Sequence, residues 1–330
     1  MDEVVIARSR RIQQRHVIDD ASKVGEVRRA AQTLANFEID AEVAGKVALA
    51  ATELANNLLL HADGGELLIQ TLGGDDSTVI ELLAIDRGPG MTDIGRCMKD
   101  GYSTAGTPGT GLGAVRRLAT EFDIHSVPGE GTVAMARFGN GEGVRYGAVN
   151  VALEGEVECG DSWSLQEDSQ GLALFVIDGL GHGTFAAEAA RAGLDAFNAG
   201  PFAPPQEILL RANDVMSKTR GGAAACARII GDKLSYAGIG NISGALVSPD
   251  KSQGLVSHNG TLGLNQRRSQ QFEYQRAPGA LLIMHSDGVS ARWDLKSRPD
   301  LLSRHPAIIA AALYRDHGRG RDDATVVVVG

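Results

Sequence analysis

The sequence predicts two domains of the α+β class, and three observations support this prediction. The chain has 330 residues, which exceeds the usual size of a single domain. Its hydrophobic fraction of 43%, beside 22% charged residues, is ordinary for a globular protein. A polar, glycine-rich stretch at residues 139–143 separates two halves with different element patterns. We therefore expect one domain over residues 1–139, a linker over residues 140–145 and a second domain over residues 146–330.

The first half is expected to place helices on one face of a mainly antiparallel sheet. Apolar runs, turn residues and the helix cap Asp40 define these elements. The expected elements are short strands at residues 4–7 and 16–18, helices at 21–37 and 41–60, a hairpin of 67–71 with 79–85, and a hairpin of 122–127 with 132–138.

Two glycine clusters in this half predict a nucleotide pocket. Residues 86–90 read Asp-Arg-Gly-Pro-Gly and follow the apolar strand 79–85, so Asp86 is placed at a strand end. Residues 109–113 read Gly-Thr-Gly-Leu-Gly and lead into a helical pattern, whose free N–H groups favour phosphate. An acid at one end and an anion-binding helix start at the other suit a nucleotide.

Glu53 and Asn57 are four residues apart on the second expected helix, so they share one face. Taken alone, such a pair is typical of a solvated helix face. The pair is followed along the chain by the two glycine clusters and by Gly131 and Thr132. In this order the motifs resemble the GHKL superfamily of ATPases and kinases, and within it the RsbT-like serine/threonine kinases.

The resemblance implies a Bergerat-type ATP-binding α/β sandwich with an adenine pocket, a phosphate cradle and a catalytic base. By it, Glu53 would deprotonate a protein serine or threonine, and Asn57 would bind the Mg²⁺ that accompanies ATP. The implied nucleotide contacts are Asp86, Gly88 and Gly90 for adenine, Gly109, Gly111 and Gly113 for the phosphates, and Thr132 on the last hairpin, with Ser103 and Thr104 in a short lid.

The second half contains many strands with short polar turns, and it predicts a sandwich of two sheets flanked by helices. The expected strands are 172–177, 223–230, 234–239, 244–248, 280–285 and 325–329, and the expected helices are 184–197 and 205–219.

Acidic residues gather at the ends of these strands. Asp161, Asp178, Asp287 and Asp322 each stand beside a predicted strand in a glycine- or serine-containing turn. One Asp-Gly after a strand is usually only a turn, but four carboxylates that converge repel one another unless a divalent cation neutralises them. Oxygen ligands of this kind suit Mg²⁺ or Mn²⁺ and not zinc.

The motifs around these acids, among them Asp178-Gly179, Gly240-Asn241 and Asp322-Asp323, resemble the type 2C metal-dependent protein phosphatases, with the SpoIIE and RsbX branch nearest. The resemblance implies an α-β-β-α sandwich in which two Mn²⁺ or Mg²⁺ ions activate a water that attacks phosphorus. The implied ligands are Asp161, Asp178 as the bridging group, Gly179 through its carbonyl, Asp287 and Asp322; Asp323 either ligates or orients Asp322.

Two departures from that pattern stand out. Many of these phosphatases have a histidine where this chain has Leu180; His182 could replace it, although a helix-start role is favoured. No arginine lies in residues 159–164 to bind substrate phosphate, so Arg191, Arg220 and Arg228 are alternatives.

Composition limits the function classes. The net charge of −9 argues against nucleic acid or an anionic membrane as the main partner, and the three separated cysteines favour a reducing compartment. We expect a cytoplasmic protein, because we find neither a signal peptide nor a spanning apolar run.

Joined together, the halves predict a bifunctional enzyme that phosphorylates and dephosphorylates serine or threonine. By the resemblance, its substrates are STAS-domain proteins of a bacterial sigma-factor or stress switch. The alternative is a phosphatase whose ATP fold only binds nucleotide or partner and regulates the adjoining domain without kinase activity.

Overall fold

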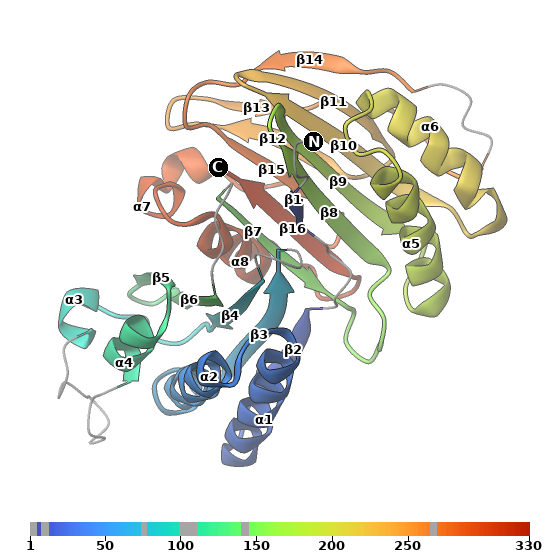
Figure 1. The fold of residues 1–330 in the computed structure, drawn as a ribbon. Helices are drawn as coiled ribbons and strands as arrows, with labels where there is room; N and C mark the ends of the chain where they lie inside the picture. Colours follow the sequence, from blue (N-terminus) through green and yellow to red (C-terminus); the bar gives the residue numbers. More distant parts are fainter. Residues whose placement is uncertain (1–4, 8–12, 74–77, 99–110, 140–144, 265–268) are drawn as a thin grey trace. The chain divides into compact units, whose positions relative to one another are not determined.

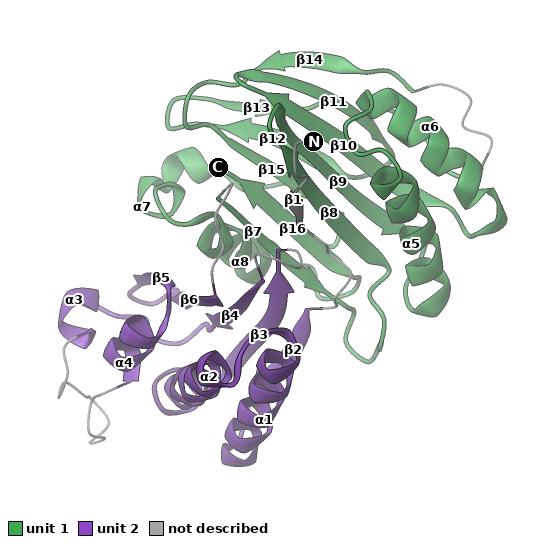
Figure 2. Ribbon diagram, in the orientation of Figure 1, with its two compact units in different colours: residues 1–12, 144–330 green, residues 13–143 purple. Residues whose placement is uncertain are grey.

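The protein is represented by a computed structural model that describes residues 5–7, 13–73, 78–98, 111–139, 145–264 and 269–330 (Figure 1). It contains two compact units (Figure 2). One unit covers residues 13–143, and the other covers residues 144–330 together with the short strand β1 (Val5–Ala7). Each unit mixes helices and sheet, so the α+β prediction is confirmed. None of the helices in the described ranges is long and apolar enough to cross a membrane.

The first unit is a five-stranded antiparallel sheet in the order β2-β3-β4-β6-β5, with helices packed on one face. Leu67 and Leu82 point from the sheet into a core shared with Val27 of the first long helix and Leu54 of the second. The strands are β2 (Gln14–Ile18), β3 (Gly65–Leu72), β4 (Val79–Ile85), β5 (Glu121–Val127) and β6 (Gly131–Gly139), and the helices are α1 (Ala21–Glu38), α2 (Ala41–Ala62), α3 (Ile94–Cys97) and α4 (Gly111–Leu118).

Helix α2 has strong start and stop signals. The Asp40 carboxylate accepts hydrogen bonds from the backbone N–H groups of Glu42 and Val43 at 2.9 and 3.0 Å, as the sequence predicted for this cap. Asp63 ends the helix with a positive φ of 57°. These contacts define the two ends of the helix that carries Glu53 and Asn57.

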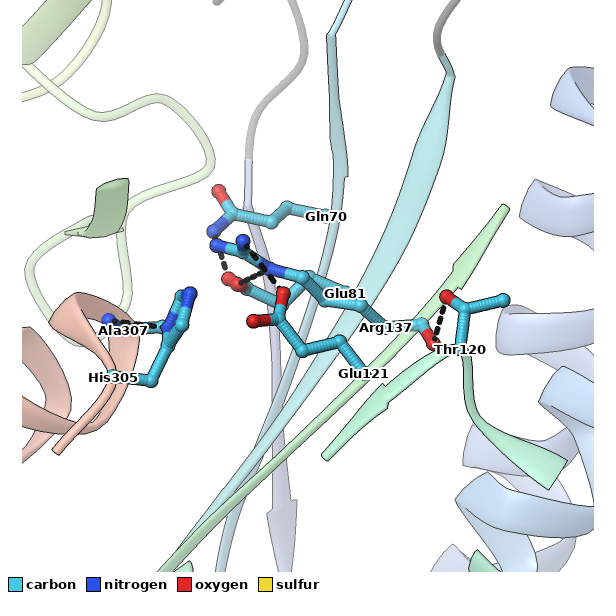
Figure 3. A network of polar contacts seen from close by, with 7 residues as sticks. All are labelled: Gln70, Glu81, Thr120, Glu121, Arg137, His305 and Ala307. Atoms are coloured by element: carbon cyan, nitrogen blue, oxygen red, sulfur yellow. Dashed lines mark hydrogen bonds and ion pairs between the residues drawn. The ribbon is translucent and has the colours of Figure 1, made fainter. Parts of the chain in front are cut away.

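The face of the sheet opposite the helices carries a buried polar network (Figure 3). Glu81 lies between the core residues of β4 and therefore points to that other face, where it is 0% exposed. Its carboxylate accepts from Gln70 Nε2 at 2.6 Å and from Arg137 Nε at 2.7 Å. Arg137 also reaches Glu121 at 3.3 Å. A buried carboxylate is thus compensated by a neighbouring guanidinium.

The second unit is a sandwich of two antiparallel sheets with a helical layer on each side. Helices α5 and α6 pack on the first sheet, β1-β8-β9-β10-β11-β14, and α8 packs on β7 and β16 of the second, β13-β12-β15-β16-β7. The strands are β7 (Tyr146–Val151), β8 (Asp161–Asp168), β9 (Gly171–Gly179), β10 (Gly222–Ile230), β11 (Lys233–Ile239), β12 (Ser243–Val247), β13 (Ser252–Gly254), β14 (Phe272–Gln275), β15 (Leu281–His285) and β16 (Ala324–Val329). The helices are α5 (Thr184–Asn198), α6 (Pro205–Val215), α7 (Pro299–Leu302) and α8 (Pro306–His317).

Two expectations differ from the structure, and one long helix of the second unit was not predicted. The strand expected at residues 4–7 was placed in the first domain, but β1 pairs with β8, with Ile6 opposite Gln166. A strand of three residues carries no pattern that specifies which sheet edge it joins. Asp161 was expected to precede its strand and instead opens β8. Helix α8 was not predicted; the side chain of its N-cap His305 accepts from Ala307 N at 3.1 Å (Figure 3).

Candidate functional site

The side chains of Glu53 and Asn57 converge on the start of α4. A Cβ atom at Gly111 would lie 3.2 Å from Asn57 Oδ1 and 3.4 Å from Glu53 Oε2. The Asn57 Nδ2 atom is buried and has no hydrogen-bond partner in the described part of the chain. The absence of a side chain at Gly111 therefore leaves space beside two polar groups, one of which is buried and unsatisfied.

Asp86 is fixed by the backbone around it. Its Oδ1 atom accepts from the N–H of Gly88 at 2.8 Å and from the N–H of Thr132 at 3.0 Å. Its own N–H donates to the carbonyl of Thr132 at 2.9 Å. The end of β4 and the start of β6 are thereby locked together, so the structure brings Asp86, Gly88 and Thr132 into one group.

Close packing leaves no room for a side chain at Gly88 or Gly90. A Cβ at residue 88 would lie 2.6 Å from Cα of Ala62, in the last turn of α2. Gly90 has a φ of +67°, and a Cβ there would meet the carbonyl of Val127. Helix α2 thus contacts the Asp86 turn at Ala62 and faces Gly111 through Asn57, about 7.5 Å back along the helix at 1.5 Å per residue.

Of the other predicted nucleotide contacts, only some lie in the described part of the chain. Gly113 lies buried within α4. Gly109, together with Ser103 and Thr104, lies outside the described residues. The unsatisfied Asn57 Nδ2 is a hydrogen-bond donor and suits a phosphate oxygen, whereas the Asn57 Oδ1 atom beside Gly111 is an oxygen ligand of the kind that Mg²⁺ takes. The groups that the structure does describe therefore fit ATP with Mg²⁺.

In the second unit, Asp161 and Asp178 lie directly opposite each other on neighbouring strands β8 and β9. Burial raises the pKa of Asp178 to about 7, and repulsion from Asp287 and Asp322 adds to this effect. Burial is the main cause that raises the pKa of Asp161 well above its usual range, and repulsion from Asp178 adds to it. The predicted carboxylates therefore share one electrostatic environment.

The Oδ2 atom of Asp161 is buried without a hydrogen-bond partner among the described residues. No three His, Cys, Asp or Glu side chains in the described ranges are arranged to hold a metal by themselves. Mg²⁺ characteristically keeps several waters and takes only one or two carboxylates. The donor set of carboxylates with one orphaned oxygen therefore fits hydrated divalent cations.

Gly179 is held tightly at the end of β9. Its N–H donates to the carbonyl of Gly160 at 3.0 Å, and a Cβ at this position would overlap the carbonyl of Ala186 in α5. The strand end bearing Asp178 therefore packs against α5 and the Gly160 segment at the same time.

Asp323 has a different environment from Asp322. Its two carboxylate oxygens accept from the N–H groups of Leu153 and Gly160, each at 2.8 Å, and its residue is 2% exposed. Its own N–H donates to Asp322 Oδ1 at 3.0 Å. This geometry fits the orienting alternative for Asp323, because it anchors the segment before Asp161 and contacts Asp322.

Two asparagines that the sequence did not assign a role contact this group. Asn241 Nδ2 donates to Asp287 Oδ2 at 2.7 Å. Asn150 Nδ2 donates to Thr325 Oγ1 at 2.7 Å and to the carbonyl of Asp161 at 3.3 Å. The Gly240-Asn241 pair after a strand could have marked Asn241 as a site residue from the sequence. No local pattern marks Asn150, which reaches Thr325 through the pairing of β7 with β16.

His182, the possible substitute for the missing histidine, is exposed and pairs with a carboxylate. Its Nδ1 lies 2.6 Å from Glu156 Oε1. This contact links the start of α5 to the segment before β8, which supports the structural reading of His182.

Comparison with known proteins gives two separate matches along the chain. Residues 18–137 match the family described as histidine kinase-like ATPase domain, and residues 168–330 match the family described as stage II sporulation protein E (SpoIIE). The chain is 41% identical over 91 residues to the serine/threonine-protein kinase RsbT of Bacillus subtilis (strain 168), covering 28% of this chain and 68% of RsbT.

The chain is also 29% identical over 140 residues to the phosphoserine phosphatase RsbX of the same organism, covering 42% of this chain and 70% of RsbX. A solved structure described as "The bacterial stressosome: a modular system that has been adapted to control secondary messenger signaling" is similar with a TM-score of 0.54. That similarity has 25% sequence identity and covers 57% of this chain and 100% of the other.

Proposed function

Because the chain belongs to the family of the RsbT serine/threonine kinase through its first unit and joins to it a SpoIIE-like, type 2C phosphatase domain, we propose that it both phosphorylates and dephosphorylates serine or threonine of regulatory proteins. The observation that carries the phosphatase half is the pair of aspartates opposite each other on neighbouring strands, the buried Asp161 and the partly buried Asp178, whose pKa values are both raised.

In the phosphatase domain, Asp161, Asp178, Asp287, Asp322 and the Gly179 carbonyl would hold two Mn²⁺ or Mg²⁺ ions. Such ions supply an acidified water and stabilise charge on the phosphoryl oxygens. Asn241 orients the Asp287 carboxylate, and Asp323 fixes the backbone before Asp161. These contacts keep the ligands in place while the substrate exchanges.

In the kinase domain, Glu53 would take the proton from the substrate hydroxyl. Asn57 would hold the Mg²⁺ of ATP next to Gly111, and Asp86 would accept from the adenine amino group. The convergence of Glu53 and Asn57 on the cradle at Gly111 supports transfer to a protein hydroxyl, because a module that only binds nucleotide has no use for a base at that point.

The proposed substrates are STAS-domain proteins of a stressosome-like switch. RsbT is named as a serine/threonine-protein kinase and RsbX as a phosphoserine phosphatase, which are reactions in opposite directions. Their counterparts on one chain would act on one substrate pool at equal stoichiometry, with the second activity present at high effective concentration.

The phosphatase proposal is tested by phosphate release from a phosphoserine peptide in the presence of Mn²⁺. We expect Asp178→Asn to lose at least about 100-fold in rate, since it removes a metal ligand. Asp250→Asn is the matched control, because Asp250 is an exposed aspartate outside the site. Equal loss in both variants, or no loss in Asp178→Asn, would contradict the proposal.

The kinase proposal is tested by transfer of the γ-phosphate of ATP to a STAS-domain protein in the Asp178→Asn background, where the product is not removed. Transfer that depends on Glu53 supports a kinase. ATP binding without transfer would favour the alternative, in which the first unit only regulates the phosphatase domain.

A further inference from the structure

Arg220 lies close in the fold to Asp178, one of the clustered aspartates of the second unit. It lies two residues before β10, in which Gly222 pairs with Gly179 and Ala223 pairs with Asp178. The carbonyl of Gly221, the next residue, accepts from the N–H of Leu180 at 2.9 Å. The backbone of Arg220 is thereby tied to the strand end that carries Asp178.

The side chain of Arg220 returns over this same strand end. Its guanidinium carbon lies 4.9 Å from the centroid of the Phe185 ring, near the start of α5. Its Nη1 atom lies 3.2 Å from the position that a Cβ on Gly181 would occupy. The guanidinium therefore lies beside the Gly179-Leu180-Gly181 turn, and a cation–π contact fixes it there.

The three arginines considered from the sequence differ in their partners. Arg191 donates to the carbonyl of Ala187 and pairs with Glu158 at 3.3 Å. Arg228 donates to the carbonyl of Phe202 and lies well along β10, opposite Ala173. Arg220 is exposed and forms no hydrogen bond or ion pair within the described part of the chain. Of the three, it alone keeps all its N–H groups available.

A phosphate dianion that enters this site approaches several carboxylates of the same sign, so a nearby cation would favour its binding. A cationic, planar fork with free donors can bind two phosphate oxygens at once, and the stacked ring holds the fork without using any donor. We propose that Arg220, held by Phe185, binds the phosphate group of the phosphorylated side chain and positions it at the carboxylate site. This inference rests on the proposed phosphatase function.

The test is steady-state hydrolysis of a phosphoserine peptide with Mn²⁺, together with the inhibition constant for inorganic phosphate. We expect Arg220→Ala to raise both KM and the phosphate inhibition constant about 10- to 100-fold, the range for loss of charge-assisted hydrogen bonds. Arg220→Lys should restore only part of the binding, because it keeps the charge but not the fork. Phe185→Leu should raise KM by a smaller factor.

Lys218→Ala is the matched control, since Lys218 is another exposed cation two residues earlier, and its constants should not change. If wild-type protein does not hydrolyse the peptide, the proposed function fails. If wild type is active and Arg220→Ala keeps the wild-type KM and phosphate inhibition constant, only this inference is overturned. Should Arg220→Ala not fold, unchanged constants in Arg220→Lys and Phe185→Leu together would overturn it equally.

Discussion

Asp161 and Asp178 face each other at the start of β8 and the end of β9, and both lie in a site that removes them from water. Two buried like charges raise the free energy of the folded state unless a cation or a proton neutralises them. The carboxylates needed for the proposed metal site are therefore a cost to stability when no metal is bound.

Asp178→Asn tests this cost. In EDTA the substitution removes one of the repelling charges, so we expect the melting temperature of the second unit to rise by about 2–5 °C, as for a domain of this size gaining about 1 kcal/mol. Added Mn²⁺ should stabilise wild type but much less the variant. Thermal unfolding with and without Mn²⁺ measures both effects.

Asp250→Asn serves as the control, because it removes an exposed charge and should leave the Mn²⁺ shift intact. A lower melting temperature for Asp178→Asn in EDTA, or a full Mn²⁺ shift in that variant, would contradict the placement of Asp178 in the metal site.

Gly111→Ala tests the nucleotide site at the level of one methyl group. The new Cβ would lie 3.2 Å from Asn57 Oδ1 and occupy the cradle, so we expect affinity for Mg²⁺-ATP to fall about tenfold, or about 1.4 kcal/mol. Gly45→Ala is the control, because a Cβ there meets nothing within 4 Å and should stabilise α2 by about 0.5–1 kcal/mol. Calorimetric titration with nucleotide separates the two; equal affinities would remove Gly111 from the site.

At the scale of elements, the sheet of the first unit contains a buried ion pair that joins neighbouring strands. Glu81 on β4 joins Gln70 on β3 to Arg137 on β6. We expect Glu81→Ala to lower the free energy of unfolding by about 3–5 kcal/mol, because Arg137 loses the buried carboxylate that compensates its charge. Urea denaturation measures this loss.

Lys46→Ala is the comparison for that experiment. Lys46 pairs with Glu42 at 2.8 Å on the exposed side of α2, and removal of such a pair costs only about 0.5 kcal/mol or less. If the two variants had similar stabilities, the network on the far face of the sheet would contribute no more than a surface pair.

The elements also show what sequence patterns can specify. Helix α2 and the β3–β4 and β5–β6 hairpins were predicted, because caps, turns and apolar runs are local signals. Helix α8 was missed, since every residue from Pro306 to Leu313 is buried and this part of the helix has no polar face to mark its period. Strand β8 was missed because its polar Ser164 and Gln166 are buried, where Asn198 of α5 binds them.

At the scale of the whole molecule, the sequence places the aspartates of both candidate sites at or near the ends of apolar strands, and it marks Glu53 by its four-residue spacing from Asn57 on α2. The contacts that support these residues were not predictable. Asn150 meets Thr325, 175 residues away, and Asn241 meets Asp287, 46 residues away. Only the folded sheets bring these pairs together, and a single sequence contains no pattern for such pairing.

A chain with two opposing activities would consume ATP without net change if both ran freely. Each unit has its own core and its own candidate site. We therefore expect the substitutions in one site to leave the chemistry of the other intact, so the two activities can be separated by mutation.

The measurement that tests the central claim most directly is the intact mass of a STAS-domain protein after incubation with ATP, Mg²⁺, Mn²⁺ and this enzyme. Wild type, Asp178→Asn and the double variant Glu53→Ala/Asp178→Asn are compared. We predict that phosphate accumulates on the substrate with Asp178→Asn and not with the double variant, since Glu53 adds the phosphate and Asp178 is needed to remove it. Absence of phosphate with Asp178→Asn, or equal phosphate with the double variant, would contradict the bifunctional account.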